Sequence, residues 1–232
     1  MLQLYQMAGT LYIVATPIGN LSDISFRALE ILKSVDLILA EDTRQTGKLL
    51  MYYDIDIPTL SYHQHSSDSK KAEILVQLLS GKNIALVTDA GTPGVSDPGN
   101  ELIDYLLSKE PNTIIIPIPG PSSITTALSV SGFKAGEFTF LGYAPKKGRT
   151  KFLEEIKNAR RTVVFFESPY RIVKLVDKLI NQLSENKQIF IGQELTKLHE
   201  RALRGNLKEV KRELEKEVKE LGRIKGEIVV VI

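Results

Sequence analysis

The amino-acid sequence predicts an α/β protein whose first half forms a mainly parallel sheet with helices on both faces. Short, uniformly apolar runs rich in β-branched residues alternate with longer runs in which apolar residues recur at helical spacing. The short runs lack the polar–apolar alternation of a half-exposed strand, so these strands are expected to be buried on both faces. Helices that alternate with such strands are expected to cover both sides of the sheet.

Each element of the first half follows from this local pattern. Residues 11–15 are an apolar run that ends at Pro17 and Gly19, which predicts a strand. Residues 24–35 carry apolar side chains at helical spacing, which predicts a helix. The same criteria predict strands at 37–40, 59–62, 84–87 and 114–116, and helices at 43–52, 70–79 and 99–107. Either Thr43 or Asp42 is expected to be the N-cap of the second helix.

A dense group of prolines and glycine at residues 117–121 is the strongest break in the chain. It predicts a boundary between an N-terminal domain, residues 1–118, and a C-terminal domain, residues 119–232. The second is expected to be a smaller α/β domain with a mixed sheet. Its expected helices are 122–130, 151–159, 170–183 and 207–219, and its expected strands are 138–141, 163–166, 189–191, 202–203 and 228–232. The last run is too apolar for a free tail and is predicted to be a central strand.

Composition excludes several classes of protein. The 232 residues include no Cys, so disulfides, thiolate nucleophiles and Cys-based zinc sites are impossible. No apolar run approaches the roughly 20 residues that cross a bilayer, and the first nine residues lack the features of a signal peptide. We therefore expect a cytoplasmic protein without a membrane partner.

The net charge of +2 conceals an asymmetry. Residues 1–118 contain 8 Lys+Arg and 14 Asp+Glu, a net charge of −6, whereas residues 119–232 contain 22 and 14, a net charge of +8. A basic half suggests a polyanionic partner. The alternative is that these charges lie on solvated helix faces.

Three loops rich in Gly and Pro follow predicted strands, at residues 15–20, 89–99 and 117–123. In open α/β sheets, ligands bind beyond the carboxyl ends of strands, where backbone amides are exposed and glycine permits close approach. The three loops therefore predict a cofactor pocket, although each alone would be an ordinary strand-to-helix turn. The dinucleotide fingerprint and the Walker phosphate loop are both absent. A cofactor held by backbone contacts, such as a cationic sulfonium compound, fits this acidic half better than a phosphate-rich one.

Several charged residues are candidates for chemistry in the first half. Asp42 follows a strand at the same expected sheet edge and is either a helix cap or a functional carboxylate. Arg44 lies in the first turn of a helix, where the helix dipole disfavours a cation, so we expect it to bind a phosphate or a carboxylate. His63 and His65 follow another strand; they are candidates for proton acceptance or RNA contact, and lack a third ligand for a metal.

In the second half, Glu167 lies in an abrupt turn that follows the strand around Phe165. Residues 146–151 form a dense basic loop that suits contacts with RNA phosphates. Its cations Lys146, Lys147 and Arg149 are the expected RNA-binding residues, together with Arg44. The alternative is a solubilising loop between a strand and a helix.

Taken in order, the motifs resemble the tetrapyrrole methylase superfamily, and within it the RNA-directed branch. They are VATPIGNL at 14–21, AEDTR at 40–44, DAGTP at 89–93, SDPG at 96–99, PGPS at 119–122, FESP at 166–169 and ELTK at 194–197. The resemblance covers residues 11–232. It implies two α/β domains with the S-adenosylmethionine (AdoMet) pocket in the cleft between them, and a homodimer. The implied reaction is methylation of the ribose 2′-hydroxyl of a decoding-region cytidine in 16S rRNA.

The resemblance also implies which residues bind the cofactor. They are Pro17, Ile18, Gly19, Gly91, Thr92, Pro93, Gly94, Val95, Ser122, Ser123, Phe166 and Glu167. Candidates for accepting the proton of the ribose hydroxyl, by position alone, are Asp42, Glu167 and His63. No metal is expected.

Two departures from the family pattern bear on the substrate. Relatives that act on corrins and porphyrins carry Gly-Asp-Pro where this chain has Gly91-Thr92-Pro93, which disfavours a tetrapyrrole substrate. Longer members of the RNA-directed branch continue beyond the last strand, so any RNA contacts made there are expected to be missing here or made elsewhere. The alternatives are a methyltransferase for a tetrapyrrole or a modified protein side chain, and a non-catalytic RNA-binding protein of the same fold.

Overall fold

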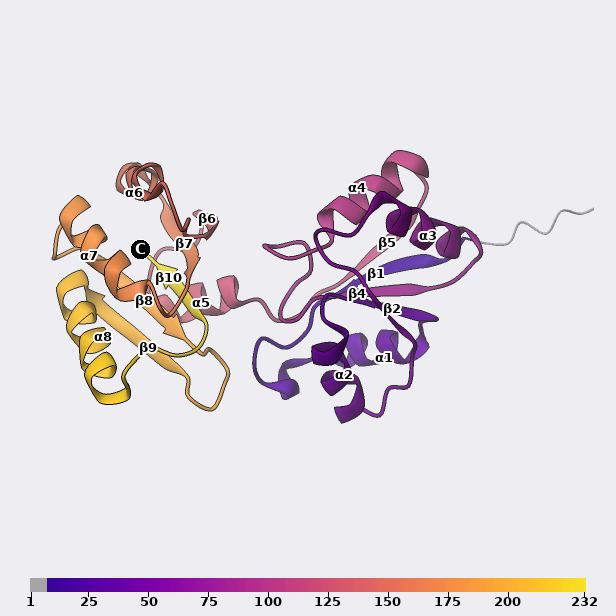
Figure 1. Cartoon of the computed structure of the whole chain (residues 1–232), viewed down its shortest axis with the longest axis horizontal. Helices are drawn as coiled ribbons and strands as arrows, with labels where there is room; N and C mark the ends of the chain where they lie inside the picture. Colours follow the sequence, from indigo (N-terminus) through magenta and orange to yellow (C-terminus); the bar gives the residue numbers. More distant parts are fainter. Residues whose placement is uncertain (1–7) are drawn as a thin grey trace, which may run out of the picture. The chain divides into compact units, whose positions relative to one another are not determined.

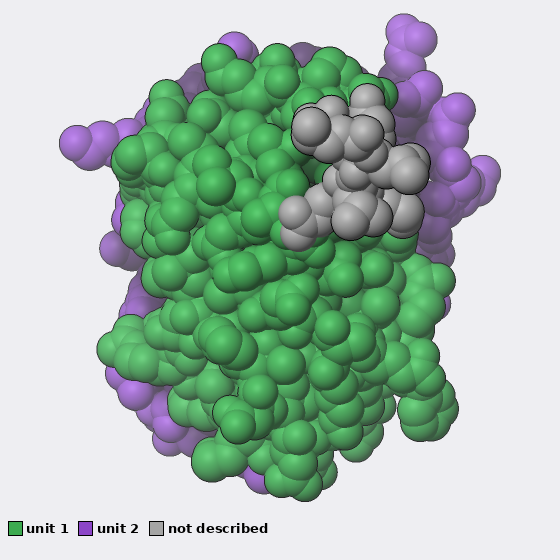
Figure 2. Space-filling model, turned by 90° about the vertical axis from the view of Figure 1, so that its right-hand side faces the viewer, with its two compact units in different colours: residues 1–122 green, residues 123–232 purple. Residues whose placement is uncertain are grey.

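The computed structural model describes residues 8–232 and divides into two compact units, residues 1–122 and 123–232. Figure 2 colours the two units separately.

Unit 1 contains a five-stranded, fully parallel sheet (Figure 1). Its strands are β1 (Thr10–Val14), β2 (Leu37–Ala40), β3 (Thr59–Ser61), β4 (Ile84–Val87) and β5 (Ile114–Ile118), in the spatial order β3-β2-β4-β1-β5. Its α-helices are α1 (Phe26–Ser34), α2 (Thr43–Tyr52), α3 (Asp68–Leu79) and α4 (Asn100–Lys109), and η1 (Leu21–Asp23) is a short 3₁₀-helix. The predicted parallel sheet is confirmed.

The two faces of this sheet are covered by different helices. Ile38 and Ala40 of β2 pack with α1 and α2 in one apolar cluster. Leu37 and Leu39 of the same strand pack with α3 and α4 in another. All four side chains are buried, because successive residues of a strand point to opposite faces. The uninterrupted apolar run of β2 therefore reflects two cores rather than one.

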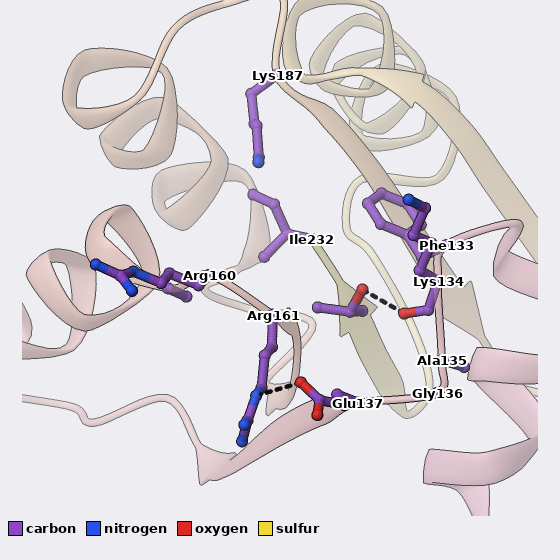
Figure 3. Close-up of a pocket in the computed structure, with 11 residues that line it drawn as sticks. Phe133, Lys134, Ala135, Gly136, Glu137, Arg160, Arg161, Lys187 and Ile232 are labelled. Atoms are coloured by element: carbon purple, nitrogen blue, oxygen red, sulfur yellow. Dashed lines mark hydrogen bonds and ion pairs between the residues drawn. The ribbon is translucent and has the colours of Figure 1, made fainter.

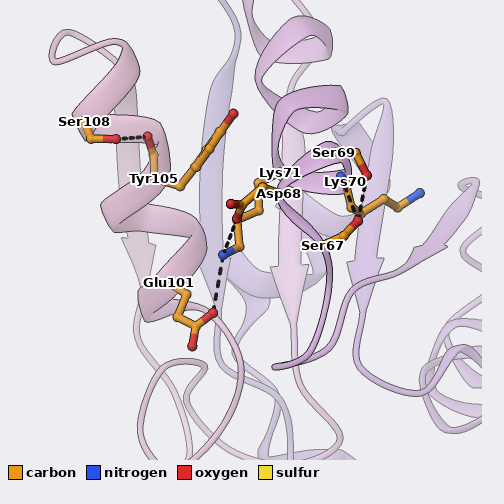
Figure 4. Close-up of polar contacts among 8 residues, drawn as sticks. All are labelled: Ser67, Asp68, Ser69, Lys70, Lys71, Glu101, Tyr105 and Ser108. Atoms are coloured by element: carbon orange, nitrogen blue, oxygen red, sulfur yellow. Dashed lines mark hydrogen bonds and ion pairs between the residues drawn. The ribbon is translucent and has the colours of Figure 1, made fainter.

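The helices on the second face are linked by an ion pair (Figure 4). Lys71 of α3 lies with its Nζ 3.2 Å from Asp68 and 3.4 Å from Glu101 of α4. The hydrogen bond with Asp68 is the main cause that raises the pKa of Lys71. The lysine therefore stays charged and joins the amino-terminal turns of α3 and α4.

Unit 2 contains a mixed five-stranded sheet in the order β6-β7-β10-β8-β9. Its strands are β6 (Phe138–Tyr143), β7 (Thr162–Glu167), β8 (Gln188–Gln193), β9 (Arg201–Asn206) and β10 (Ile228–Val231). Its helices are α5 (Ser123–Ser131), α6 (Arg149–Asn158), α7 (Ile172–Gln182) and α8 (Leu207–Leu221). β10 pairs antiparallel with β7 and β8, so the prediction of a central last strand is confirmed. One cluster joins α6, α7 and α8 to this sheet.

Some element ends differ from those expected. The first helix begins at Phe26 rather than at residue 24, because the Ser25 side chain accepts a hydrogen bond from the Ala28 N–H and caps it. The second helix is capped by Asp42 and not by Thr43. β9 has six residues where two were expected. The residues of this edge strand are partly or fully exposed, so no apolar run marks it.

Within residues 8–232, none of the helices has both the length and the apolar character that a membrane span requires.

The core of unit 2 predicts a large effect at Leu175 of α7, which is fully buried in its apolar cluster. We expect Leu175→Ala to lower the free energy of unfolding by about 2–5 kcal/mol, because it removes buried methyl groups and leaves a cavity. Urea unfolding followed by circular dichroism measures this. The exposed neighbour Lys174→Ala is the matched control, and an equal effect of both substitutions would contradict the packing described.

Candidate active site

The loops that follow β1 and β4 are joined by a two-residue bridge. The Thr16 N–H donates to the Gly91 carbonyl at 2.9 Å, and the Gly91 N–H donates to the Thr16 carbonyl at 3.1 Å. Gly91 has a φ of +86°, a conformation that L side chains rarely adopt. The bridge holds residues 17–19 and 92–95 beside each other at the carboxyl edge of the unit 1 sheet.

The third Gly/Pro loop is attached to the same edge. The Thr92 hydroxyl donates to the Pro121 carbonyl at 3.2 Å, and the Ala15 N–H donates to the Ile118 carbonyl at 3.1 Å. Gly120 passes so close to Ala15 that an added Cβ would lie 3.1 Å from the alanine side chain. The structure thus brings together the loops that contain Pro17, Gly91–Val95 and Ser122. Ser123 begins α5, and Phe166 and Glu167 end β7, in unit 2.

Three carboxylates lie at this edge of unit 1. Asp42 and Glu41 follow β2, and Asp89 follows β4. The Asp42 N–H donates to Asp89 Oδ1 at 3.1 Å, and the Asp89 N–H donates to Glu41 Oε2 at 3.4 Å. The expected position of Asp42 beside the Gly/Pro loops is therefore found. Such an acidic edge favours a cationic ligand and disfavours a phosphate-rich one.

Asp42 caps α2 and also binds Arg44. Its carboxylate accepts hydrogen bonds from the Arg44 side chain, at 2.7 Å from Nη2 and 3.0 Å from Nε, and from the Arg44 N–H at 2.9 Å. The Arg44 guanidinium lowers the pKa of Asp42 to about 2, and the backbone hydrogen bond adds to this. Asp42 is consequently a poor proton acceptor. The ion pair also explains how a cation is tolerated in the first helical turn.

Glu41 is the carboxylate that our sequence interpretation missed. Burial raises its pKa above the ordinary value, and the Asp89 and Asp42 carboxylates add to the rise, against the hydrogen bond from the Asp89 N–H and the nearby His63. A raised pKa makes a carboxylate a stronger proton acceptor. Its position after β2 was visible in the sequence, but its partial burial was not.

The two histidines lie in the loop after β3 and are exposed. The His65 N–H donates to His63 Nδ1 at 3.2 Å, and the ring centroids are 6.5 Å apart. This hydrogen bond requires Nδ1 of His63 to be unprotonated, so its Nε2 carries the proton in the neutral ring. His63 is close enough to Glu41 to lower the pKa of that carboxyl.

A polar atom at the same edge supports a ligand site. The Oγ1 of Thr88, at the end of β4, is buried without a hydrogen-bond partner in the described part of the chain. Buried hydroxyls are normally paired, and an orphan is expected where a ligand supplies the missing group. Backbone-lined loops, carboxylates and an orphan hydroxyl fit a small, cationic, hydrogen-bonding cofactor such as AdoMet.

At the carboxyl end of β7 in unit 2, Glu167 is buried between two arginines. Its Oε2 lies 2.8 Å from Arg149 Nη2, and its Oε1 lies 2.6 Å from Arg171 Nη2. The Glu167 side chain is fully shielded from solvent, and the Ser168 N–H also donates to it at 2.7 Å. A carboxylate bound by two cations and a backbone N–H is poorly suited to accept a proton. The expectation that Glu167 acts as a base is therefore corrected.

The same cluster corrects the expectation for Arg149. We expected this arginine to contact RNA, but it is buried, and its Nε donates to the Pro145 carbonyl at 2.8 Å. Arg171 reaches the Ala144 carbonyl at 3.5 Å. The Glu167 cluster thus anchors the segment that leads into the basic loop, in which Lys146 and Lys147 are free to face solvent. Arg149 and Glu167 are 18 positions apart, so no local sequence pattern indicates that they pair.

A model of the tetrapyrrole (corrin/porphyrin) methylases matches residues 10–211. The chain belongs to this family. A ribosomal RNA small subunit methyltransferase I from Synechocystis sp. is 45% identical over 201 residues, which cover 86% of this chain and 71% of that protein. The protein of the same name from Thermotoga maritima is 44% identical over 217 residues, which cover 93% and 96%.

Solved structures support the fold. Cobalt precorrin-4 methyltransferase, a cobalamin biosynthetic enzyme, matches with a TM-score of 0.68 at 18% identity, covering 96% of this chain and 94% of that chain. The expected family, its RNA-directed branch, the two-sheet α/β fold and the assignment as an AdoMet-dependent methyltransferase are confirmed.

The Asp42–Arg44 pair predicts an unusual titration. Because the pKa of Asp42 in the folded protein is below its ordinary value of 3.8, the ion pair stabilises the fold fully above that value. Its contribution is lost as the pH falls from there towards about 2. NMR titration of the Asp42 carboxyl carbon is expected to show a midpoint of about 2 in the wild type. Arg44→Gln should move it towards 3.8. A wild-type midpoint already at the ordinary value would contradict the pairing.

The Glu167 cluster predicts coupled losses of stability and loop order. Glu167→Gln leaves two arginines without their buried counterion, and we expect it to lower the free energy of unfolding by about 3 kcal/mol or more. It should also speed tryptic cleavage after Lys146 and Lys147, because the anchored carbonyls are released. Glu185→Gln, which breaks the exposed pair with Lys208, is the control and should cost less than about 1 kcal/mol. Equal effects of both substitutions would refute an anchoring role.

Proposed function

We propose that this chain transfers a methyl group from AdoMet to 16S rRNA of the small ribosomal subunit, at the ribose 2′-hydroxyl of a decoding-region cytidine. The observation that carries this proposal is the set of three joined, Gly/Pro-rich loops beside an acidic sheet edge, in a chain whose relatives are named ribosomal RNA small subunit methyltransferase I. The rRNA target supports the further proposal that the protein acts in the cytoplasm. A homodimer is proposed from the family resemblance.

Residues of the joined loops are proposed to hold AdoMet through backbone groups. They are Pro17, Ile18 and Gly19 from the first loop, Gly91, Thr92, Pro93, Gly94 and Val95 from the second, and Ser122 from the third, with Ser123, Phe166 and Glu167 as proposed contacts of unit 2. The Thr88 hydroxyl is added, because it is buried and unpaired. For Glu167 the proposed contribution is the position of its backbone, since the side chain is occupied by two arginines. AdoMet would supply the methyl group from its sulfonium centre, from which a neutral thioether is a good leaving group.

The protein's own tasks are alignment and removal of the hydroxyl proton. Rigid loops that hold donor and acceptor in line lower the barrier without a strong base. A ribose hydroxyl is still a poor nucleophile, so a group that accepts its proton late in the reaction adds to the rate. Glu41 suits this task best among the unit 1 carboxylates. His63 is the second candidate, and its Nδ1 would have to release the His65 N–H before it could accept a proton. Asp42 serves instead to cap α2 and to hold Arg44.

RNA is proposed to contact Lys146 and Lys147, with Arg44 as a further phosphate ligand. The Arg44 side chain is 87% exposed although it is paired with Asp42. An exposed pair of this kind contributes little stability and can exchange its carboxylate for a phosphate. Such contacts position an RNA without reading its sequence.

A methyl-transfer assay tests the function directly. The full chain is incubated with tritiated AdoMet and small subunits from cells that lack this modification, and the labelled rRNA is mapped by nuclease digestion. Label in the ribose of a decoding-region cytidine supports the proposal. Label in a tetrapyrrole or a protein side chain supports the rival methyltransferases. Salt-sensitive RNA binding without AdoMet binding by calorimetry indicates a non-catalytic RNA-binding protein.

The proposed role of Glu41 predicts a loss of turnover. Glu41→Gln removes the proton acceptor while keeping its size, and we expect kcat to fall by about 10²-fold or more with little change in AdoMet affinity. The wild type should lose kcat as the pH falls and Glu41 becomes protonated. The variant's pH–rate profile should lack this decline at low pH. Asp36→Asn, at the opposite end of β2, is the control. An unchanged kcat would assign the proton transfer elsewhere.

A further inference from the structure

Unit 2 has a basic pocket on the edge of its sheet opposite to Glu167. The pocket has a volume of about 760 Å³ and lies where β6, β7 and β8 begin. Its cations are Lys134, Arg160, Arg161 and Lys187, and the carboxylate side chain among its lining residues is Glu137. Figure 3 shows these side chains around Ile232. The function derived above does not use any of them.

Three of these cations are available to a ligand. Arg161 is paired with Glu137 at 2.8 Å, an exposed interaction. Within residues 8–232, the side chains of Lys134, Arg160 and Lys187 form neither an ion pair nor a hydrogen bond to another side chain. Gathering unpaired like charges costs free energy unless an anion offsets it. The four cations outnumber the Glu137 side chain and the α-carboxylate of Ile232, the last residue of the sequence, so the pocket has a net positive charge.

The backbone around the pocket is well fixed. The Thr162 hydroxyl donates to the Lys134 carbonyl at 2.6 Å, and the Leu207 N–H donates to the Lys187 carbonyl at 2.9 Å. Ile232 exchanges two backbone hydrogen bonds with Val163, at 2.8 and 2.9 Å. The cations thus lie on segments that lead into β6, β7 and β8 and are tied down by these hydrogen bonds, so less conformational entropy is lost when they bind a ligand.

The spacing of the cations suits a polyanion better than a small anion. They come from three separate segments, residues 133–137, 159–162 and 187, and Figure 3 shows Arg160 and Lys187 on different sides of Ile232. A single phosphate would need them to converge on one point. A chain of phosphates matches cations spread around a rim, and the partly exposed ring of Phe133 can contact a base or ribose between them.

We infer that this pocket is a second RNA-backbone site of the enzyme, at the opposite end of β7 from Glu167. Successive residues of a strand rise about 3.3 Å, so the six residues of β7 place the pocket roughly 17 Å from Glu167. An RNA that contacts both this pocket and the Lys146–Lys147 loop must span that distance. The inference rests on the proposed function and makes it more specific: the substrate is a folded rRNA segment or an assembled particle rather than a short single strand.

The test compares two double variants in the full chain. R160Q/K187Q removes two pocket cations, and K216Q/K219Q removes two exposed lysines from α8 as the control. Binding of a fluorescein-labelled stem-loop from the small-subunit rRNA is measured by fluorescence anisotropy over a range of salt concentrations. We expect R160Q/K187Q to bind about tenfold more weakly and to reduce the salt slope by about 1.5, because two phosphate contacts are lost. The control should match the wild type, and all three proteins should melt alike.

Two results would overturn the inference. One is equal RNA affinity and salt slope for R160Q/K187Q and the control. The other is binding of inorganic pyrophosphate to the wild type that the R160Q/K187Q substitutions abolish while the RNA affinity stays unchanged. That result would indicate a site for a small anion. The wild-type methyl-transfer assay separates these failures from a failure of the proposed function. If the wild type methylates rRNA, a negative binding result refutes the pocket alone.

Discussion

The bridge between Thr16 and Gly91 is the constraint on which the candidate site depends. Two backbone hydrogen bonds join loops that are 75 positions apart in the chain, and they lie at the carboxyl edge where β1 and β4 pair. Because β1 and β4 are parallel neighbours, both loops leave the sheet at the same edge. The Thr92–Pro121 hydrogen bond then attaches the third loop. A parallel sheet with this strand order thus turns three separate sequence motifs into one surface.

The two units differ in charge, and each suits a ligand of opposite charge. The acidic edge of unit 1 suits a cationic methyl donor, and the basic character of unit 2 suits RNA phosphates. One acid in the basic half, Glu167, is an internal counterion for Arg149 and Arg171. Burying this cluster costs desolvation free energy, which is offset only when all three charges are paired. The segment that leads into the basic loop is therefore held through a carboxylate that is fully shielded from solvent.

Much of the fold was predictable because its signals are local. The strands 37–40 and 84–87 were predicted to the residue, since a strand buried on both faces is an unbroken apolar run. The last strand was predicted one residue too long, at 228–232, but its central position followed correctly from its apolarity. β9 was underestimated because mixed burial at a sheet edge weakens that signal. The Gly/Pro loops were predicted because glycine and proline act on the backbone of their own turn.

The parts of the site that could not be predicted depend on distant contacts. Arg149 looked like one of several solvated cations, and only the fold shows its partner Glu167. Glu41 and Asp42 are adjacent in sequence, yet burial raises the pKa of one and an arginine lowers that of the other. The most direct measurement of the central claim is a crystal structure of the chain with AdoMet. The account predicts density for the donor against residues 16–19, 88–95 and 119–122; density elsewhere, with these loops in contact only with solvent, would contradict it.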